Sequence, residues 1–166
     1  MKQTKQVRIF NSQSAETIAV GASPYSILLG GEHSEGQLGI IEMLVPPGSG
    51  PVPHEHKGFQ ECFYVLEGEV EMKTKEQTVL ARKGDLVHIP LDGPVHCFKN
   101  TGSQHARLLC IVVPSGLDAF FREAGRPIPV GTMPEVTGPP SPEQVAQLNL
   151  TAEKYGQKLY PKNYLD

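Results

Sequence analysis

One stretch of the chain carries residue types that bind transition metals. His54, His56 and Glu61 lie close together in the sequence, and His96 follows after a further hairpin-like region. Imidazole nitrogens with one carboxylate oxygen are a ligand set that suits divalent transition metals. Residues two apart on a β-strand point to the same face, so His54 and His56 should share one side of a strand. The pattern therefore predicts a metal site supported by strands.

Three further polar residues, Gln60, His88 and Asn100, could contribute to such a site. Gln60 is an alternative oxygen ligand to Glu61, and strand parity does not decide between them because a turn at 57–58 intervenes. Glu61 is favoured because a carboxylate binds a divalent cation more strongly than an amide does. We expect His88 to be a structural or pocket-lining residue. We expect Asn100 to be a turn residue, or one that orients a ligand.

The chain up to residue 114 reads as a series of short strands. Apolar or alternating runs recur about every ten residues, with glycine or proline between them, which favours an all-β sandwich or barrel. No regular alternation of strand and helix is present, so an α/β fold is not expected. The expected strands are 17–20, 26–29, 38–45, 61–66, 70–74, 77–81, 86–89, 95–99 and 106–113. The polar segment 31–36 is expected to be a loop that exposes His33 to solvent.

Beyond Pro114 the pattern becomes helical. Residues 115–118 resemble a helix N-cap, and Gly125 should end that helix. Residues 126–140 hold five prolines and two glycines, which predicts an extended connector. Ser141, Pro142 and Gln144 then form a capping-box signature for a last helix that ends at Gly156.

Composition excludes several classes of function. The net charge is −3 with no basic cluster, so nucleic acid is not an expected partner. No apolar run of about 20 residues is present and the first residues lack the apolar core of a signal peptide, so we expect a cytoplasmic protein with no membrane partner. The three cysteines, Cys62, Cys97 and Cys110, are expected to be buried, reduced thiols rather than ligands.

Two ordered motifs in the chain resemble those of the cupin family. In the first, five residues separate Gly48 from the His-Glu-His triplet, four more precede Glu61, and six more precede Gly68. The second motif of the family is similar to the series Gly84, Pro90, Gly93, His96 and Asn100. This chain departs from it by one residue, because two residues rather than one separate Pro90 from Gly93.

The resemblance implies an all-β fold, the cupin double-stranded β-helix or jelly-roll barrel, with C-terminal helices packed on it. It predicts one domain over residues 1–166, with a barrel core at about 15–114 and a helical extension at 115–160. The phrases PHEHKGFQECFYVLEGEVE and ARLLCIVVPSGLDAFF, together with the helical tail, are most similar to the small single-domain cupins grouped with the quercetin 2,3-dioxygenases. The likeness covers roughly residues 15–160.

This likeness implies a metal-dependent dioxygenase acting on a flavonol-like or other enolisable aromatic small molecule. A 3-His-1-Glu site would hold one divalent ion, Mn, Fe, Ni, Co, Cu or Zn, and the residues do not select among these metals. Glu61 is the expected catalytic base. The pocket should be lined by Phe63, Val65, Met72 and Phe98.

Other functions fit the same residues. A non-catalytic cupin that binds or senses a small molecule is the main alternative, since one fold supports many functions. A sugar isomerase or epimerase is the third, although it would favour a more polar barrel lining. Partners are expected to be a small-molecule substrate, dioxygen if the protein is an oxygenase, and a second copy of the chain in a homodimer.

Overall fold

The computed structural model describes residues 6–136 and 138–166. Its strands are β1 (Glu16–Val20), β2 (Ser23–Leu29), β3 (Gly39–Val45), β4 (His54–His56), β5 (Gln60–Glu67), β6 (Glu69–Lys73), β7 (Thr78–Arg82), β8 (Leu86–Ile89), β9 (Cys97–Lys99), β10 (Ala106–Val113), β11 (Arg126–Ile128) and β12 (Gln157–Leu159). Its helices are α1 (Gly31–Ser34), α2 (Leu117–Ala124), α3 (Pro142–Lys154) and the short 3-10 helix η1 (Ser12–Ser14).

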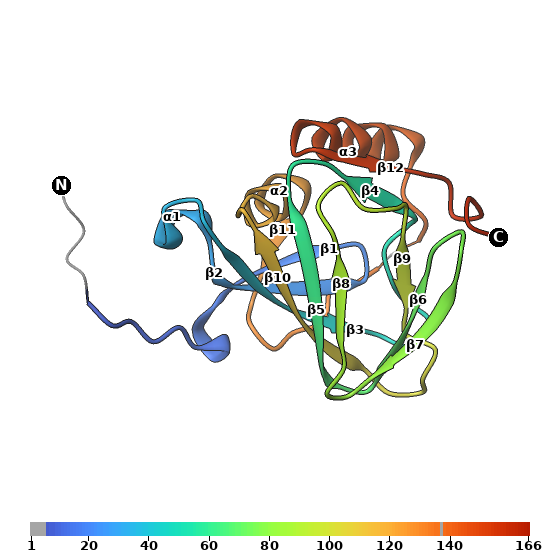
Figure 1. The fold of residues 1–166 in the computed structure, drawn as a ribbon. Helices are drawn as coiled ribbons and strands as arrows, with labels where there is room; N and C mark the ends of the chain where they lie inside the picture. Colours follow the sequence, from blue (N-terminus) through green and yellow to red (C-terminus); the bar gives the residue numbers. More distant parts are fainter. Residues whose placement is uncertain (1–5, 137) are drawn as a thin grey trace.

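The strands form one large sheet and two small ones (Figure 1). The large sheet has the order β11-β1-β2-β3-β10-β5-β8, and the small sheets have the orders β7-β6-β9 and β12-β4. Every pairing between the named strands is antiparallel. The large sheet packs against the β7-β6-β9 sheet, since the rings of Phe63 and Phe98 meet edge to face at 5.2 Å. This arrangement confirms the predicted all-β jelly roll.

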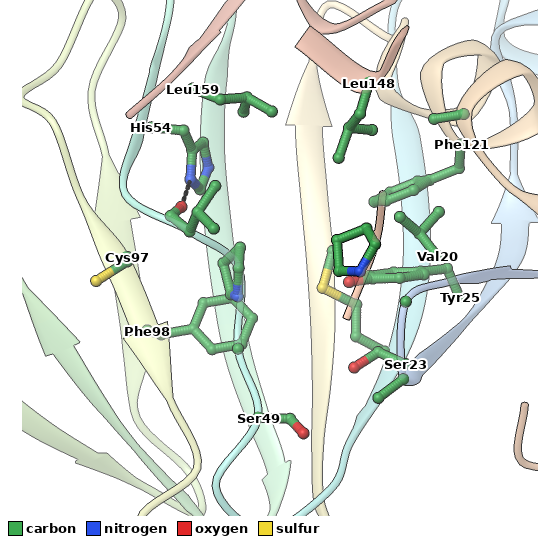
Figure 2. Close-up of a pocket in the computed structure, with 18 of the residues that line it drawn as sticks. Val20, Ser23, Tyr25, Ser49, His54, Cys97, Phe98, Phe121, Leu148 and Leu159 are labelled. Atoms are coloured by element: carbon green, nitrogen blue, oxygen red, sulfur yellow. Dashed lines mark hydrogen bonds between the residues drawn. The ribbon is translucent and has the colours of Figure 1, made fainter. Parts of the chain in front are cut away.

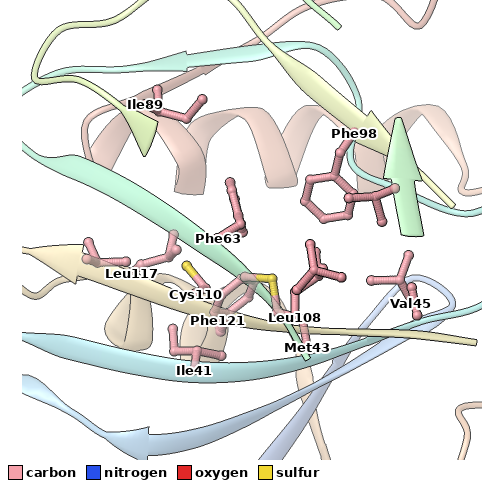
Figure 3. Packing of buried hydrophobic residues seen from close by; sticks show 14 of the residues in the cluster. Ile41, Met43, Val45, Phe63, Ile89, Phe98, Leu108, Cys110, Leu117 and Phe121 are labelled. Carbon is pink, nitrogen blue, oxygen red and sulfur yellow. The ribbon is translucent and has the colours of Figure 1, made fainter. Parts of the chain in front are cut away.

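The core lies between these sheets and follows from strict alternation along the central strands (Figure 3). In β3 every second residue is buried, and β10 shows the same pattern. Ile41 and Cys110 lie opposite each other across β3 and β10, and neither is exposed. A period of two places one set of side chains in the core, which fixes the strand register. The same register decides which polar side chains point inward.

The C-terminal helices begin and end as their sequence signals predict. Ser141 Oγ accepts a hydrogen bond from the Gln144 backbone N–H, and the Gln144 side chain accepts one from the Ser141 N–H, which completes the capping box. In Figure 1, α3 lies over the end of the barrel next to β12 and β4. Among the described residues, no helix combines the length and the apolar composition needed to cross a bilayer.

Three local predictions need correction. The expected connector 126–140 begins with a strand, β11, which pairs with β1 through long-range contacts that local sequence does not reveal. The expected loop 31–36 contains the short helix α1, which ends where Glu35 adopts a left-handed conformation with φ 55°. Strand β2 begins at Ser23 rather than at residue 26, so it includes a proline.

Asn100 holds the loop that leads into β4. It is 1% exposed, and its Nδ2 donates to the carbonyl oxygens of Val45 and Gln104 at 2.8 and 2.7 Å. Its Oδ1 accepts from the Gly102 N–H at 2.9 Å, and its backbone carbonyl accepts from the Gly48 N–H at 2.8 Å. These bonds tie the ends of β3, β9 and β10 together and so position the strand that carries His54 and His56.

Replacing Asn100 with alanine should destabilise the protein by about 2–4 kcal/mol, because buried carbonyl groups would lose their donors. Urea unfolding measures this change. Thr101→Ala, at an exposed neighbouring position, is the matched control and should change stability by less than about 0.5 kcal/mol. Equal effects of the two substitutions would show that the Asn100 bonds do not support the fold.

Candidate metal centre

His54, at the start of β4, and His96, the residue before β9, lie directly opposite each other. Their backbones form an isolated antiparallel bridge in which each N–H donates to the other residue's carbonyl at 2.9 Å. Opposite residues of an antiparallel pair project to the same face. The imidazole rings accordingly lie 4.5 Å apart between centroids. His56, two residues along β4, projects to this face as well and is 2% exposed.

Each of the three imidazoles is oriented by a backbone carbonyl. The Nδ1 atoms of His54, His56 and His96 lie 2.9, 3.2 and 2.9 Å from the carbonyl oxygens of Val52, Phe59 and Pro94. A carbonyl oxygen only accepts hydrogen bonds, so each Nδ1 carries the proton and each Nε2 keeps its lone pair. Metal-binding histidines commonly have this arrangement.

Glu61 supplies one free carboxylate oxygen to the same region. It lies on β5 with its side chain inward and is 3% exposed. The thiol of Cys110 donates to Glu61 Oε1 with a sulfur–oxygen distance of 3.0 Å. The other oxygen, Oε2, lies 3.4 Å from His56 Nε2 and 3.8 Å from His96 Nε2. Two donors that share an ion at about 2.1 Å are themselves roughly 3–4 Å apart, so this spacing fits a common metal ion.

Three polar atoms of the cluster have no hydrogen-bond partner among the described residues. Within the described ranges, His56 Nε2, Glu61 Oε2 and His96 Nε2 are buried atoms that make no hydrogen bond. The ligand atoms of His54, Glu61 and His96 all lie within 4.8 Å of one another. Buried atoms of this kind are costly unless a ligand satisfies them. The His-His-Glu cluster is therefore compatible with a metal ion.

Electrostatics favours the protonation states that a metal needs. Burial, reinforced by the nearby His96, lowers the pKa of His54 to about 4. Burial alone would raise the pKa of Glu61, but the close approach of the His56 and His96 imidazoles outweighs it and lowers that pKa well below its usual range. Burial also raises the pKa of the Cys110 thiol, which keeps it a hydrogen-bond donor. At neutral pH the cluster therefore holds a neutral His54 imidazole and an ionised Glu61 carboxylate.

The structure separates Gln60 from the cluster. Its side chain is exposed and lies 3.1 Å from His88 Nε2 on the neighbouring strand β8. The next residue, Glu61, points inward because successive side chains of a strand face opposite sides. The expectation of three buried thiols is wrong for Cys62 and Cys97, which are partly exposed, while all three are free.

A cavity of about 1580 Å³ opens beside the cluster and is lined by His54, His56 and Glu61 among others. On its opposite wall the rings of Tyr25 and Phe121 stack with centroids 4.1 Å apart, as Figure 2 shows. Burial raises the pKa of Tyr25 to about 12, so its hydroxyl stays protonated. The cavity thus joins three polar ligands to an aromatic surface.

Of the four side chains predicted to line the pocket, two do so. Phe63 and Phe98 do line the cavity, whereas Val65 and Met72 pack in the hydrophobic core. The sequence did not reveal the wall formed by Tyr25 and Phe121, which comes from β2 and α2. Leu148 and Leu159, from the C-terminal segment, also border the cavity (Figure 2). Nothing local in the sequence indicated a role at a site for either residue.

Metal-free protein should lose stability as the pH falls from about 6.5 towards 4. His54 has its pKa depressed to about 4 in the folded state, so the unfolded chain binds its proton first. The stability contribution is full above the unfolded pKa and falls by about 3 kcal/mol across this window. Urea unfolding of chelator-treated protein at several pH values measures the loss.

His54→Asn is the comparison variant for this titration, and its stability should change much less with pH over the same range. Glu61 does not confuse the result, because its depressed pKa affects stability only below its unfolded value of about 4.3. Identical pH dependence in the two proteins would contradict the role assigned to His54.

Comparisons with known proteins agree with this geometry. Residues 41–112 match the family model described as "Cupin domain". The chain is 28% identical over 119 residues to a quercetin 2,3-dioxygenase of Bacillus subtilis. The aligned region covers 72% of this chain and 35% of that protein. It is 30% identical over 81 residues to an oxalate-binding protein of Thermotoga maritima, covering 49% of this chain and 65% of the relative.

A solved structure supports the fold. The predicted oxalate decarboxylase of Thermotoga maritima superposes with a TM-score of 0.60 at 23% identity, covering 64% of this chain and 99% of that one. The chain spans only about a third of the length of the Bacillus relative, with 35% covered. With its jelly-roll sheets, its histidine–glutamate cluster and the match at residues 41–112, the chain contains a cupin domain and resembles the quercetin 2,3-dioxygenase group.

Proposed function

We propose that the protein is a metal-dependent dioxygenase of the cupin type, acting on a flavonol-like or other enolisable aromatic small molecule. The metal ligands would be His54, His56, Glu61 and His96. The observation that carries this proposal is the grouping of donor atoms beside a cavity with an aromatic wall. The ligand atoms of His54, Glu61 and His96 lie within 4.8 Å of one another, and His56 Nε2 lies 3.4 Å from Glu61 Oε2. The similarity to a quercetin 2,3-dioxygenase supports it.

The ion would be Mn, Fe, Co, Ni, Cu or Zn, because nitrogen ligands with one carboxylate accept any of these metals. When bound, such an ion supplies Lewis acidity to a substrate oxygen and, if it is redox-active, electron exchange with dioxygen. Three imidazoles and one carboxylate leave room in its coordination sphere for a small molecule.

The remaining chemistry belongs to the chain. The Glu61 carboxylate would accept the proton of the substrate hydroxyl, which leaves the substrate as an enolate. The Cys110 thiol would hold Oε1 and leave Oε2 to the metal. The rings of Tyr25 and Phe121 offer a flat apolar surface on which an aromatic substrate stacks and from which water is excluded.

A non-catalytic binding protein is the second candidate. The similarity to an oxalate-binding protein favours it, and the same ligands would hold a metal that captures an acidic small molecule without turnover. A sugar isomerase or epimerase fits less well, because the wall opposite the cluster is formed by aromatic and aliphatic side chains such as Tyr25, Phe121 and Leu148.

The purified wild-type protein should contain close to one transition metal ion per chain, and His56→Ala should weaken metal binding by more than about 100-fold. Elemental analysis after incubation with Mn, Fe, Co, Ni or Cu measures the content. His88→Ala removes an imidazole that is exposed and bonded to Gln60; it is the matched control and should retain the metal.

Oxygen uptake then separates the two candidates. Metal-loaded wild-type protein should consume dioxygen in the presence of quercetin, and His56→Ala should not. Metal binding without oxygen consumption for any enol or catechol-type substrate would favour the binding protein. A wild-type protein that takes up none of these metals would contradict both.

We also propose a homodimer in which N-terminal segments are exchanged. Residues 6–11 extend from the body of the molecule without strand pairing (Figure 1). Val7 and Ile9 alternate with polar or aromatic residues and are 99% and 93% exposed. Apolar side chains at strand spacing that find no cover within one copy fit a sheet edge of a second copy.

Replacing both Val7 and Ile9 with aspartate should convert the dimer to a monomer, because the apolar contacts with the second copy would be lost. Light scattering coupled to size exclusion measures the mass. Gln13→Asp, an exposed position nearby, adds charge without removing an apolar side chain and should leave the dimer intact. A wild-type protein that is monomeric at high concentration would refute the exchange.

A further inference from the structure

One buried amide has no partner in the structure and no role in the metal cluster. Across residues 6–136 and 138–166, four buried side-chain atoms lack a hydrogen-bond partner, and three of them belong to the cluster. The fourth is Nε2 of Gln157, a residue that is 7% exposed. Leaving a buried donor unpaired costs about 1–3 kcal/mol. A group of this kind in a native structure calls for an acceptor from outside the chain.

Strand pairing places this amide next to the cluster. β12 runs antiparallel to β4, and Gln157 lies directly opposite His56. Opposite residues share a face of the sheet and have Cβ atoms about 5 Å apart. Gln157 therefore projects to the side on which His56 meets Glu61. Both Gln157 and His56 line the cavity of about 1580 Å³.

The backbone around Gln157 is fixed on both sides. The Gly156 carbonyl accepts from the Lys57 N–H at 2.8 Å, and the Tyr160 N–H donates to the Pro53 carbonyl at 2.8 Å. Gly156 has φ 75°, and a Cβ there would approach the Lys57 carbonyl oxygen to 2.9 Å, so this turn requires glycine. A backbone fixed in this way determines which part of the cavity the Gln157 side chain can reach, as a substrate-positioning residue requires.

We propose that Gln157 positions the substrate by donating a hydrogen bond from Nε2 to a carbonyl or hydroxyl oxygen of the ligand in the cavity. This inference rests on the proposed function. The ligand would be a flat aromatic compound with at least two oxygens, one directed to the metal cluster and one to Gln157. Its ring system would lie towards the stacked rings of Tyr25 and Phe121.

The residue that selects the substrate would then lie outside the matched cupin domain, which covers residues 41–112. Gln157 comes after α3, in the segment that pairs with β4. The metal ligands come from the barrel, whereas the donor that recognises a second ligand oxygen comes from the C-terminal segment. Recognition of an oxygen by a buried donor discriminates strongly, because a ligand without that oxygen leaves the donor unpaired.

Quercetin is the probe for the test, bound to metal-loaded protein without dioxygen so that no turnover occurs. Gln157→Leu should raise the Kd for quercetin by about 10-fold or more while the metal content stays the same. Gln157→Met, close in size, guards against misfolding and should give the same result. Lys158→Leu changes the next residue, which is exposed and pairs with Glu55 on the other face, and should leave the Kd unchanged.

Steady-state oxygen uptake adds two quantities that a loss of stability alone would not change, the KM for quercetin and the pH profile. A positioning role predicts a KM for quercetin that rises in Gln157→Leu in step with Kd, with an unaltered pH profile. Equal Kd values in wild type and Gln157→Leu, with metal retained, would overturn the inference and leave the proposed function standing. Loss of metal in Gln157→Leu would also overturn it, by assigning the residue to the cluster. A metal-loaded wild type that binds no quercetin would refute both the flavonol-like substrate and this role of Gln157.

Discussion

The site depends on three hydrogen bonds from imidazole Nδ1 atoms to backbone carbonyls. Each one fixes a tautomer and a ring direction, so that His54, His56 and His96 keep their Nε2 lone pairs free close to Glu61. The carbonyls belong to Val52, Phe59 and Pro94, which lie two or three residues from their histidines. The loops around the ligand strands therefore orient the rings, and the course of these loops matters as much as the histidines themselves.

The barrel and the C-terminal segment contribute different things to this site. The barrel provides the cluster, because alternation along β4 and β5 turns His54, His56 and Glu61 inward. The C-terminal segment covers the strand that bears two of the histidines, since β12 pairs with β4. Helix α2 adds Phe121 to the aromatic wall of the cavity. The barrel thus supplies the histidine–glutamate cluster, and the segment after it supplies part of the cavity wall.

The sequence was sufficient to predict the strand-rich fold and the group of polar residues in the cluster, because both follow from local spacing. His54 and His56 are two residues apart, and Glu61 begins an alternating strand. The stacking of Tyr25 on Phe121 and the thiol of Cys110 beside Glu61 were not predicted. These contacts join residues far apart in the chain. Neither Tyr25 nor Cys110 stands in a sequence pattern that distinguishes it from an ordinary core residue.

The pairing of β12 with β4 was missed for the same physical reason. Strand β12 has only three residues, which is too short to show a periodic pattern. Its partner strand β4 lies about a hundred positions earlier in the chain. Gly156 was expected to end α3, which it does, but its left-handed conformation also turns the chain back onto Lys57. Only the folded backbone reveals that second role.

Anomalous X-ray diffraction from crystals grown with Mn, Co or Ni is the most direct test of the central claim. One anomalous peak should lie about 2.0–2.3 Å from Nε2 of His54, His56 and His96 and from an oxygen of Glu61. A peak at other residues, or no peak at this point in metal-saturated crystals, would contradict the account.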